Sequence, residues 1–241
     1  MLRFFGMFKL FLKLYPQGAV APVFVLTITE PIAFRSLSLS FSAPFAGQHD
    51  LALRACLLRI LDNPAAVEAT LARAGEVAQL PFKHGGLGLR CAARLAQAAY
   101  WASWADCLPM VHERHPPIAQ FLQHSLDLAE DMQASADCLQ EARIARATLL
   151  HEGFDECPSA RQILDGARPR QPTSPDVGEW SHGWQYWAAG VRAAYARTPL
   201  FRANRSDPTL RTLLRSQSGR GSGRVFTVLP TSPATILSLA E

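Results

Sequence analysis

Long uninterrupted apolar runs are missing from this chain of 241 residues. No stretch reaches the roughly 20 apolar residues that a helix needs to cross a bilayer. Paired C-x-x-C cysteines are missing too, and the five cysteines are odd in number and widely spaced. That pattern favours reduced intracellular thiols over a disulfide framework. We therefore expect an intracellular protein, nuclear or cytoplasmic.

Acidic residues are missing from the start of the chain, where none precedes Glu30 although Lys9 and Lys13 are present. Three interpretations of residues 1–46 stay open. A secretory signal peptide fits poorly because lysines interrupt its apolar core, whereas a mitochondrial presequence fits the basic, acid-free start. The third, which we favour, is an unrelated and poorly ordered extension left by a truncated or mis-joined reading frame. Membrane contact by residues 2–34 also stays open.

Alanine and leucine dominate the composition, and this favours helix over strand. We predict a mainly α fold, an irregular helical bundle with little or no strand. The stretch ARPRQPTSP is rich in proline and poor in apolar residues, which is typical of a linker. The predicted parts are an extension, a helical domain, a linker and a basic Trp/Arg helical segment, at residues 1–46, 47–166, 167–178 and 179–241.

Apolar periodicity, proline and glycine predict the helix boundaries. Pro109 is expected to kink or end the longest helix, and Gly153 to close another. The predicted helices are 50–62, 63–78, one from Leu89, one from Pro116, 135–151, 159–164, 179–197, 209–216 and a last partial one from Ser232. In the helix at 135–151, the residues predicted to face inward are Leu139, Ile144 and Leu149 or Leu150.

A glycine-rich turn precedes the longest predicted helix. Gly85, Gly86 and Gly88 permit positive φ and close backbone approach, so they predict a sharp turn into that helix. A phosphate-cradling loop is the alternative. Such a loop needs a third glycine three residues after Gly88 or a following Lys-Ser/Thr pair, and the sequence has neither. The structural turn is therefore the favoured interpretation.

Tryptophans recur at helical spacing in two places. Trp101 and Trp104 lie in one predicted helix, and Trp180, Trp184 and Trp187 lie in another. Spacings of three and four residues place aromatic rings on one helix face, so we expect the two helices to pack against each other. A platform on which nucleic-acid bases stack is the alternative.

Three stretches carry a resemblance to a known family: GGLGLR-x-AAR-x-A-x-AAYWASWAD-x-LPM within 80–110, the tryptophan stretch 178–187, and LLRSQSG-x-G-x-GR-x-x-T-x-LPTSP at 213–233. They resemble the region downstream of the polymerase domain in reverse-transcriptase polyproteins of protist non-LTR (LINE-like) retrotransposons. The resemblance implies a helical region that follows the palm and fingers of an RNA-directed DNA polymerase. In that family a Cys/His-rich segment follows, so we expect this chain to be a fragment whose partner is the remainder of such a polyprotein.

Polymerase chemistry requires carboxylates that hold two Mg²⁺ ions, and the family uses two adjacent aspartates for this. The sequence contains no Asp-Asp pair. The nearest acidic pair, at 130–131, lies in an Ala/Leu/Gln context typical of a solvated helix face. The palm and fingers would precede residue 50, where no room is left. We therefore predict no catalytic residue, no metal site and no cofactor.

Motifs for other chemistry are incomplete. In HERH at 112–115 the two histidines are three residues apart, whereas the zinc-protease motif needs four, so a polar loop at a helix end is the favoured interpretation. The SHG stretch at 181–183 lacks the strand–turn–helix setting of a hydrolase nucleophile. No small-molecule substrate is evident.

Arginines recur from Arg192 to Arg224, and only Asp207 opposes them. Such a stretch attracts phosphates, although a solvated basic tail explains it equally well. The predicted contacts to RNA or DNA are Arg202, Arg205, Arg211, Arg215, Arg220 and Arg224. We expect weak nucleic-acid binding without catalysis. The alternative is a helical interaction or scaffold protein, membrane-associated through its N-terminal segment, whose tryptophan faces dock a partner helix.

Overall fold

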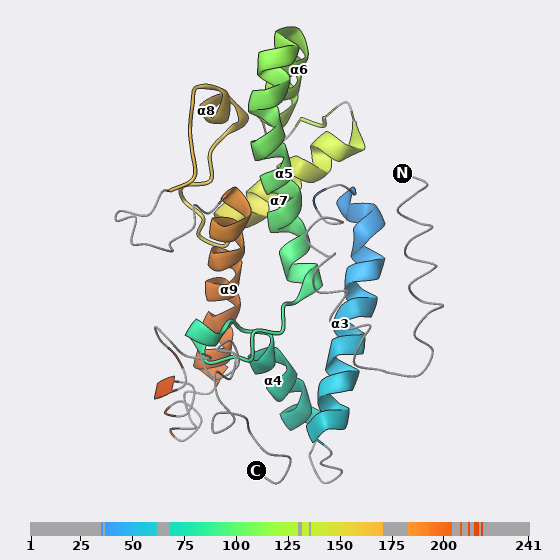
Figure 1. The fold of residues 1–241 in the computed structure, drawn as a ribbon, viewed down its shortest axis with the longest axis vertical. Helices are drawn as coiled ribbons and strands as arrows, with labels where there is room; N and C mark the ends of the chain where they lie inside the picture. Colours follow the sequence, from blue (N-terminus) through green and yellow to red (C-terminus); the bar gives the residue numbers. More distant parts are fainter. Residues whose placement is uncertain are drawn as a thin grey trace, which may run out of the picture. The chain divides into compact units, whose positions relative to one another are not determined.

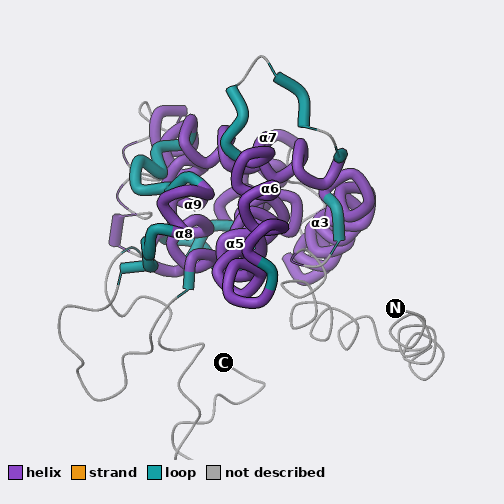
Figure 2. The backbone as a smooth tube through the Cα atoms, turned by 90° about the horizontal axis from the view of Figure 1, so that it is seen from above, coloured by secondary structure: helices purple, strands orange, loops and turns teal. Residues whose placement is uncertain are grey.

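The structure is a computed structural model that describes residues 35, 37–61, 68–129, 132–134, 136–170, 183–203, 208, 212, 215, 216 and 218. The predicted mainly α fold is confirmed, because the described residues form seven α-helices and one short 3-10 helix and contain no strand (Figure 2). The helices are α3 Leu39–Leu61, α4 Glu68–Ala78, η1 Phe82–His84, α5 Ala92–Arg114, α6 Pro116–Leu126, α7 Asp137–His151, α8 Ala160–Leu164 and α9 Trp184–Ala203.

The chain divides into two compact units, each built from two segments. The first unit comprises 1–65 and 90–195, and the second comprises 66–89 and 196–241. This division differs from the predicted one because the first part of α9 packs with the helices of the first unit. Residues 1–34 of the predicted extension lie outside the described residues, whereas its end from Leu39 to Ala46 forms the start of α3, so the prediction of poor order is wrong there. Most of the predicted linker also lies outside the described residues.

Helix α5 is the centre of the first unit and lies between α3 and the first part of α9 (Figure 1). Nine of its residues are buried, and they face more than one neighbouring helix. Alanines at 92, 96 and 99 meet α3, while Trp101, Ala105 and Leu108 contribute to a larger core with α7, α8 and α9. Because alanine side chains are small, the neighbouring helices can approach α5 closely.

Three carboxylates of the first unit cap the beginnings of three helices to which they do not belong. Asp50 accepts hydrogen bonds from the first two backbone N–H groups of α5, at 2.7 and 3.1 Å. Asp127 does the same for α8, at 2.9 and 2.8 Å, and Glu141 for α3, at 2.7 and 3.0 Å. The first turn of a helix has unpaired N–H groups and a partial positive charge, so a carboxylate there is stabilising.

The glycine turn of the second unit is confirmed as a tight structural turn. Gly85 and Gly88 have φ values of 83° and 70°, which favour glycine. A Cβ atom at Gly86 would lie 2.0 Å from the carbonyl oxygen of Leu80. The N–H groups of residues 85 to 89 all donate to backbone carbonyls of residues 78 to 82. These groups are therefore engaged and do not form a phosphate cradle.

Several helix boundaries differ from the prediction. The helix expected at 50–62 begins at Leu39, because the carboxylate of Glu141 caps its start, and it includes Pro44. Helix α5 begins at Ala92 and continues past Pro109 to Arg114, so of the two predicted effects of this proline, a kink or an end, the end does not occur. Helix α9 begins at Trp184, after the non-helical Gly183, and extends to Ala203.

The helix expected at 135–151 is α7, and Gly153 ends it as predicted. Gly153 has a φ of 95°, and its N–H donates to Leu150 while the N–H of Phe154 donates to Leu149. This pattern is the Schellman motif. Leu139 and Leu149 are buried as expected, but the prediction that Ile144 faces inward is wrong, since its side chain is 50% exposed.

Replacing Gly86 by alanine tests the turn. The added Cβ cannot fit beside the Leu80 carbonyl without a backbone shift, so we expect the free energy of unfolding to fall by about 1–3 kcal/mol. The matched control is Gly47→Ala in α3, where nothing lies within 4 Å of the added atom. There alanine should stabilise the helix by about 0.5–1 kcal/mol. Urea denaturation of both variants measures the difference, and an unchanged Gly86→Ala protein would contradict the tight turn.

Candidate functional site

The paired tryptophans form part of the core, as the helix-packing interpretation predicts. The rings of Trp101 and Trp184 lie 5.7 Å apart at 75°, and Trp101 makes a similar edge contact with Phe154 at 5.7 Å. Trp101 is 3% exposed and Trp184 is 7% exposed. These two rings are therefore not available as a base-stacking platform. Trp104 and Trp187 are half-buried, and Trp180 lies outside the described residues.

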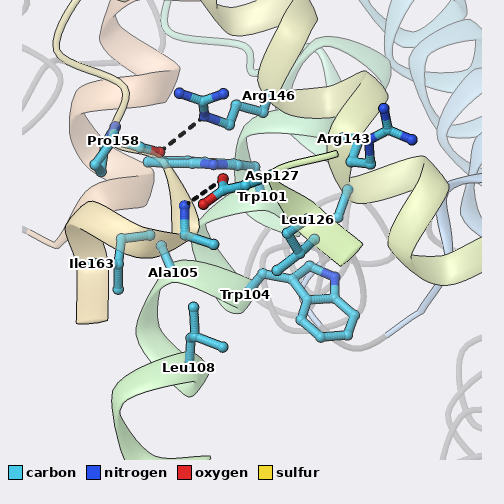
Figure 3. Close-up of a pocket in the computed structure, with 12 residues that line it drawn as sticks. Trp101, Trp104, Ala105, Leu108, Leu126, Asp127, Arg143, Arg146, Pro158 and Ile163 are labelled. Atoms are coloured by element: carbon cyan, nitrogen blue, oxygen red, sulfur yellow. Dashed lines mark hydrogen bonds between the residues drawn. The ribbon is translucent and has the colours of Figure 1, made fainter. Parts of the chain in front are cut away.

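A small pocket lies among α5, α6, α7 and α8 of the first unit (Figure 3). Its volume is about 20 Å³, which holds roughly one water molecule. Three charged side chains, Asp127, Arg143 and Arg146, line it. Asp127 caps α8, Arg143 donates to the carbonyls of Leu128 and Ala129, and Arg146 Nε donates to the carbonyl of Pro158 at 3.0 Å. All three groups are engaged in holding the fold, and the space is too small for an organic substrate.

The arginines expected to bind nucleic acid divide into separate groups. Arg202 and Arg215 are exposed. The other four lie outside the described residues: Arg205, Arg211, Arg220 and Arg224. Arg197, from the same basic stretch, lies with its guanidinium carbon 4.3 Å from the ring centre of Phe201.

Arg192, at the start of that stretch, has a structural role that the sequence does not reveal. Its Nε and one terminal nitrogen bind the two carboxylate oxygens of Glu152 at 2.7 and 2.9 Å. Its other terminal nitrogen donates to Gln97 at 2.6 Å. The side chains of Arg192 and Glu152 are only 12% and 10% exposed. This arginine therefore connects α9 to α5 and to the end of α7, and its charge is already compensated.

The cysteines do not form a reactive site among the described residues. Cys157 is buried, and burial raises the pKa of its thiol to about 12. Burial also raises the pKa of Cys91, whose thiol donates to Asp50 at 3.1 Å. Cys107 and Cys138 are exposed. A nucleophilic cysteine needs a lowered pKa, and neither buried thiol has one.

The HERH stretch at 112–115 lies at the exposed C-terminal end of α5 and just beyond it. Within the part of the chain that the structure describes, no three His, Cys, Asp or Glu side chains lie close enough together to hold a metal ion. The acidic pair at 130–131 is outside that part. No described helix is both long enough and apolar enough for a transmembrane span.

Sequence reasoning missed one group of residues in the second unit. Lys83 and His84 immediately precede the glycine turn, and the charge of Arg197 reaches His84 from α9. The sequence gives no spacing that connects η1 with α9. The only available signal is the position of the two basic residues beside a turn that fixes the backbone.

Replacing Arg192 tests whether it is structural. Arg192→Leu leaves Glu152 buried without its partner, so we expect the free energy of unfolding to fall by about 3–5 kcal/mol. The control is Arg161→Leu, at a pair with Asp165 whose side chains are 76% and 70% exposed. Because such pairs contribute little, the control should change stability by less than about 1 kcal/mol. Equal losses in urea denaturation would contradict the structural role of Arg192.

Thiol labelling tests the burial of the cysteines. In the folded protein at pH 8, iodoacetamide should modify Cys107 and Cys138 and leave Cys157 unmodified, because only the thiolate reacts and the Cys157 pKa is about 12. Mass spectrometry of tryptic peptides measures the extent at each position. Denaturation in guanidinium should make all sites react. Modification of folded Cys157 at the rate of Cys107 would show that the core is not closed.

A scan of the chain against protein-family models, and searches of curated proteins and of solved structures, found no match. A function can therefore be proposed only from the arrangement of charge and burial described above and from the resemblance of the three sequence stretches to the retroelement region.

Proposed function

We propose that this chain is a noncatalytic helical protein, related to the region after the polymerase domain of non-LTR reverse transcriptases, that binds the phosphates of RNA or DNA through its second unit. The observation that carries the proposal is the separation of charge between the two units. The segments of the second unit, 66–89 and 196–241, contain nine Arg and Lys against four Asp and Glu. The remaining segments contain 15 Arg and Lys against 16 Asp and Glu.

The arginines of the first unit support this proposal because several are occupied by protein partners. Arg192 is paired with Glu152, and Arg143 donates to the backbone carbonyls of Leu128 and Ala129. Arg35 is paired with Asp106. Their charges are compensated or are used to hold loops, so they contribute little to an attractive field around the protein.

The basic residues of the second unit are in a different situation. Arg202 and Arg215 are exposed, and neither forms an ion pair with another described residue. Exposed, uncompensated arginines can bind phosphates and release the counterions that surround a nucleic acid. The interaction requires no defined base sequence, which agrees with the lack of a base-stacking face on Trp101 and Trp184.

The carboxylates favour a noncatalytic role. Two-metal polymerase chemistry needs acidic side chains that converge on one point and face solvent. In the first unit, Asp50, Asp127 and Glu141 each bind the beginning of a different helix. The helical bundle then acts as a support for the basic unit and for whatever polymerase it accompanies.

The scaffold alternative has one observation in its favour. Ile118 and Phe121 on α6 are 52% and 55% exposed, and Met110 near the end of α5 is 54% exposed. Exposed apolar side chains of this size favour contact with another protein.

Light scattering of the purified chain tests the scaffold function. Self-association that does not depend on salt and is lost in Phe121→Asp would favour the scaffold.

Fluorescence anisotropy with a labelled single-stranded RNA of about 20 nucleotides tests the nucleic-acid function. We expect the affinity to fall steeply between 50 and 200 mM salt. The double variant Arg202→Gln/Arg215→Gln should bind more weakly and lower the slope of log K against log salt by about 1.4, at ~0.7 for each single-strand phosphate contact.

The matched control for that titration is Arg161→Gln, an exposed arginine of α8 in the first unit. It should leave both the affinity and the salt slope unchanged. Affinity that does not depend on salt, or an equal loss in the control, would contradict binding through the second unit.

A further inference from the structure

A group of three basic side chains in the second unit lies just before the glycine turn and at the end of α9. Lys83 and His84 are the last two residues of η1, and Arg197 belongs to α9. The positive charges of Lys83 and Arg197 both act on His84. Among the second unit's side chains that the structure describes, the only acidic one is Glu76, which is exposed. The group therefore carries positive charge that no described carboxylate balances.

Two buried nitrogens of this group have no hydrogen-bond partner. They are Nε2 of His84 and Nε of Arg197. A buried polar atom without a partner costs roughly 1–3 kcal/mol, and most such atoms in folded proteins are satisfied. Both atoms belong to basic side chains of the same unit, so both are available to an acceptor that carries negative charge.

The backbone determines what kind of acceptor this is. The N–H of His84 donates to the carbonyl of Pro81 at 2.8 Å, and the N–H groups of the three glycines that follow donate to the carbonyls of residues 80 to 82. The ligand must therefore be bound by side chains rather than by backbone N–H groups. An anion with several acceptor oxygens satisfies an imidazole, a guanidinium and an ammonium group together, and a phosphate group has this geometry.

We propose that Lys83, His84 and Arg197 bind a phosphate group of single-stranded RNA or DNA, with Nε2 of His84 and the Arg197 guanidinium donating hydrogen bonds to its oxygens. This site rests on the proposed nucleic-acid function and names its central contacts. Lys83 is exposed and supplies the outer charge. The two nitrogens are enclosed in the absence of an anion, so binding requires the side chains that surround them to move.

Binding at this site is coupled to a proton. Burial lowers the pKa of His84, and the charges of Lys83 and then Arg197 lower it further, so the imidazole is neutral at pH 7 in the absence of an anion. A phosphate beside the ring favours the imidazolium and raises that pKa. By linkage the protonated protein binds the phosphate more tightly, so the affinity increases as the pH falls from 8 towards 6.

The direct test is NMR of the histidine side chains in the ¹⁵N-labelled full chain. The long-range ¹H–¹⁵N signals are followed from pH 5 to 8 in potassium chloride and in inorganic phosphate at equal ionic strength, and His84→Gln identifies the His84 signal. We expect phosphate to raise the pKa of His84 by about 1 unit. The signals of His124, exposed on α6 of the first unit, should be the same in the two salts. An unchanged His84 pKa would overturn the site.

A second experiment uses the single-stranded RNA in place of inorganic phosphate and measures both the His84 pKa and the binding affinity. Arg197→Gln should weaken binding about tenfold at pH 6, whereas Arg197→Lys should keep part of the affinity because it keeps the charge. Far-UV circular dichroism confirms that both variants are folded. Salt-dependent RNA binding with no shift of His84 would overturn this site and leave the proposed function standing. A shift with inorganic phosphate but none with RNA would assign the site to free phosphate and contradict the nucleic-acid contact.

Discussion

The first unit depends on carboxylates that cap helices from a distance. Asp50, Asp127 and Glu141 each satisfy the unpaired N–H groups at the start of another helix, and each brings a negative charge to the positive end of a helix dipole. Since each cap connects two helices, it also fixes how they are arranged around α5. Three acidic residues of this unit are thus engaged in holding helices. Among the described residues, no three His, Cys, Asp or Glu side chains lie close enough together to hold a metal ion.

The two units use arginine in different ways. In the first, Arg192 and Arg143 hold other elements in place through Glu152 and through loop carbonyls. In the second, Arg202 and Arg215 are exposed, while Arg197 lies over Phe201 with a buried, unpaired Nε. The same residue type is therefore a structural element in one unit and a candidate ligand-binding group in the other. Burial and the availability of a carboxylate decide which role it has.

Much of the fold could be predicted from local patterns. The turn at Gly85, Gly86 and Gly88, the end of α7 at Gly153 and the packing of Trp101 on Trp184 all follow from residue type and spacing. The missed features depend on contacts between distant residues. The start of α3 is set by Glu141, which no pattern near Leu39 reveals. Pro109 was expected to kink or end α5, yet that helix continues to Arg114, and Leu108 beside the proline is buried in the core.

The candidate site was less predictable than the fold. The arginine stretch led to the hypothesis of phosphate binding, which stays a prediction. That hypothesis included Arg192 and passed over Lys83 and His84, because η1 and α9 are far apart in the sequence. The central claim is that the second unit contacts the nucleic acid. Photo-crosslinking of the full chain to RNA containing 4-thiouridine, with mass spectrometry of the crosslinked peptides, tests it most directly. Crosslinks confined to 66–89 and 196–241 are predicted, and crosslinks concentrated on α5, α6 or α7 would contradict it.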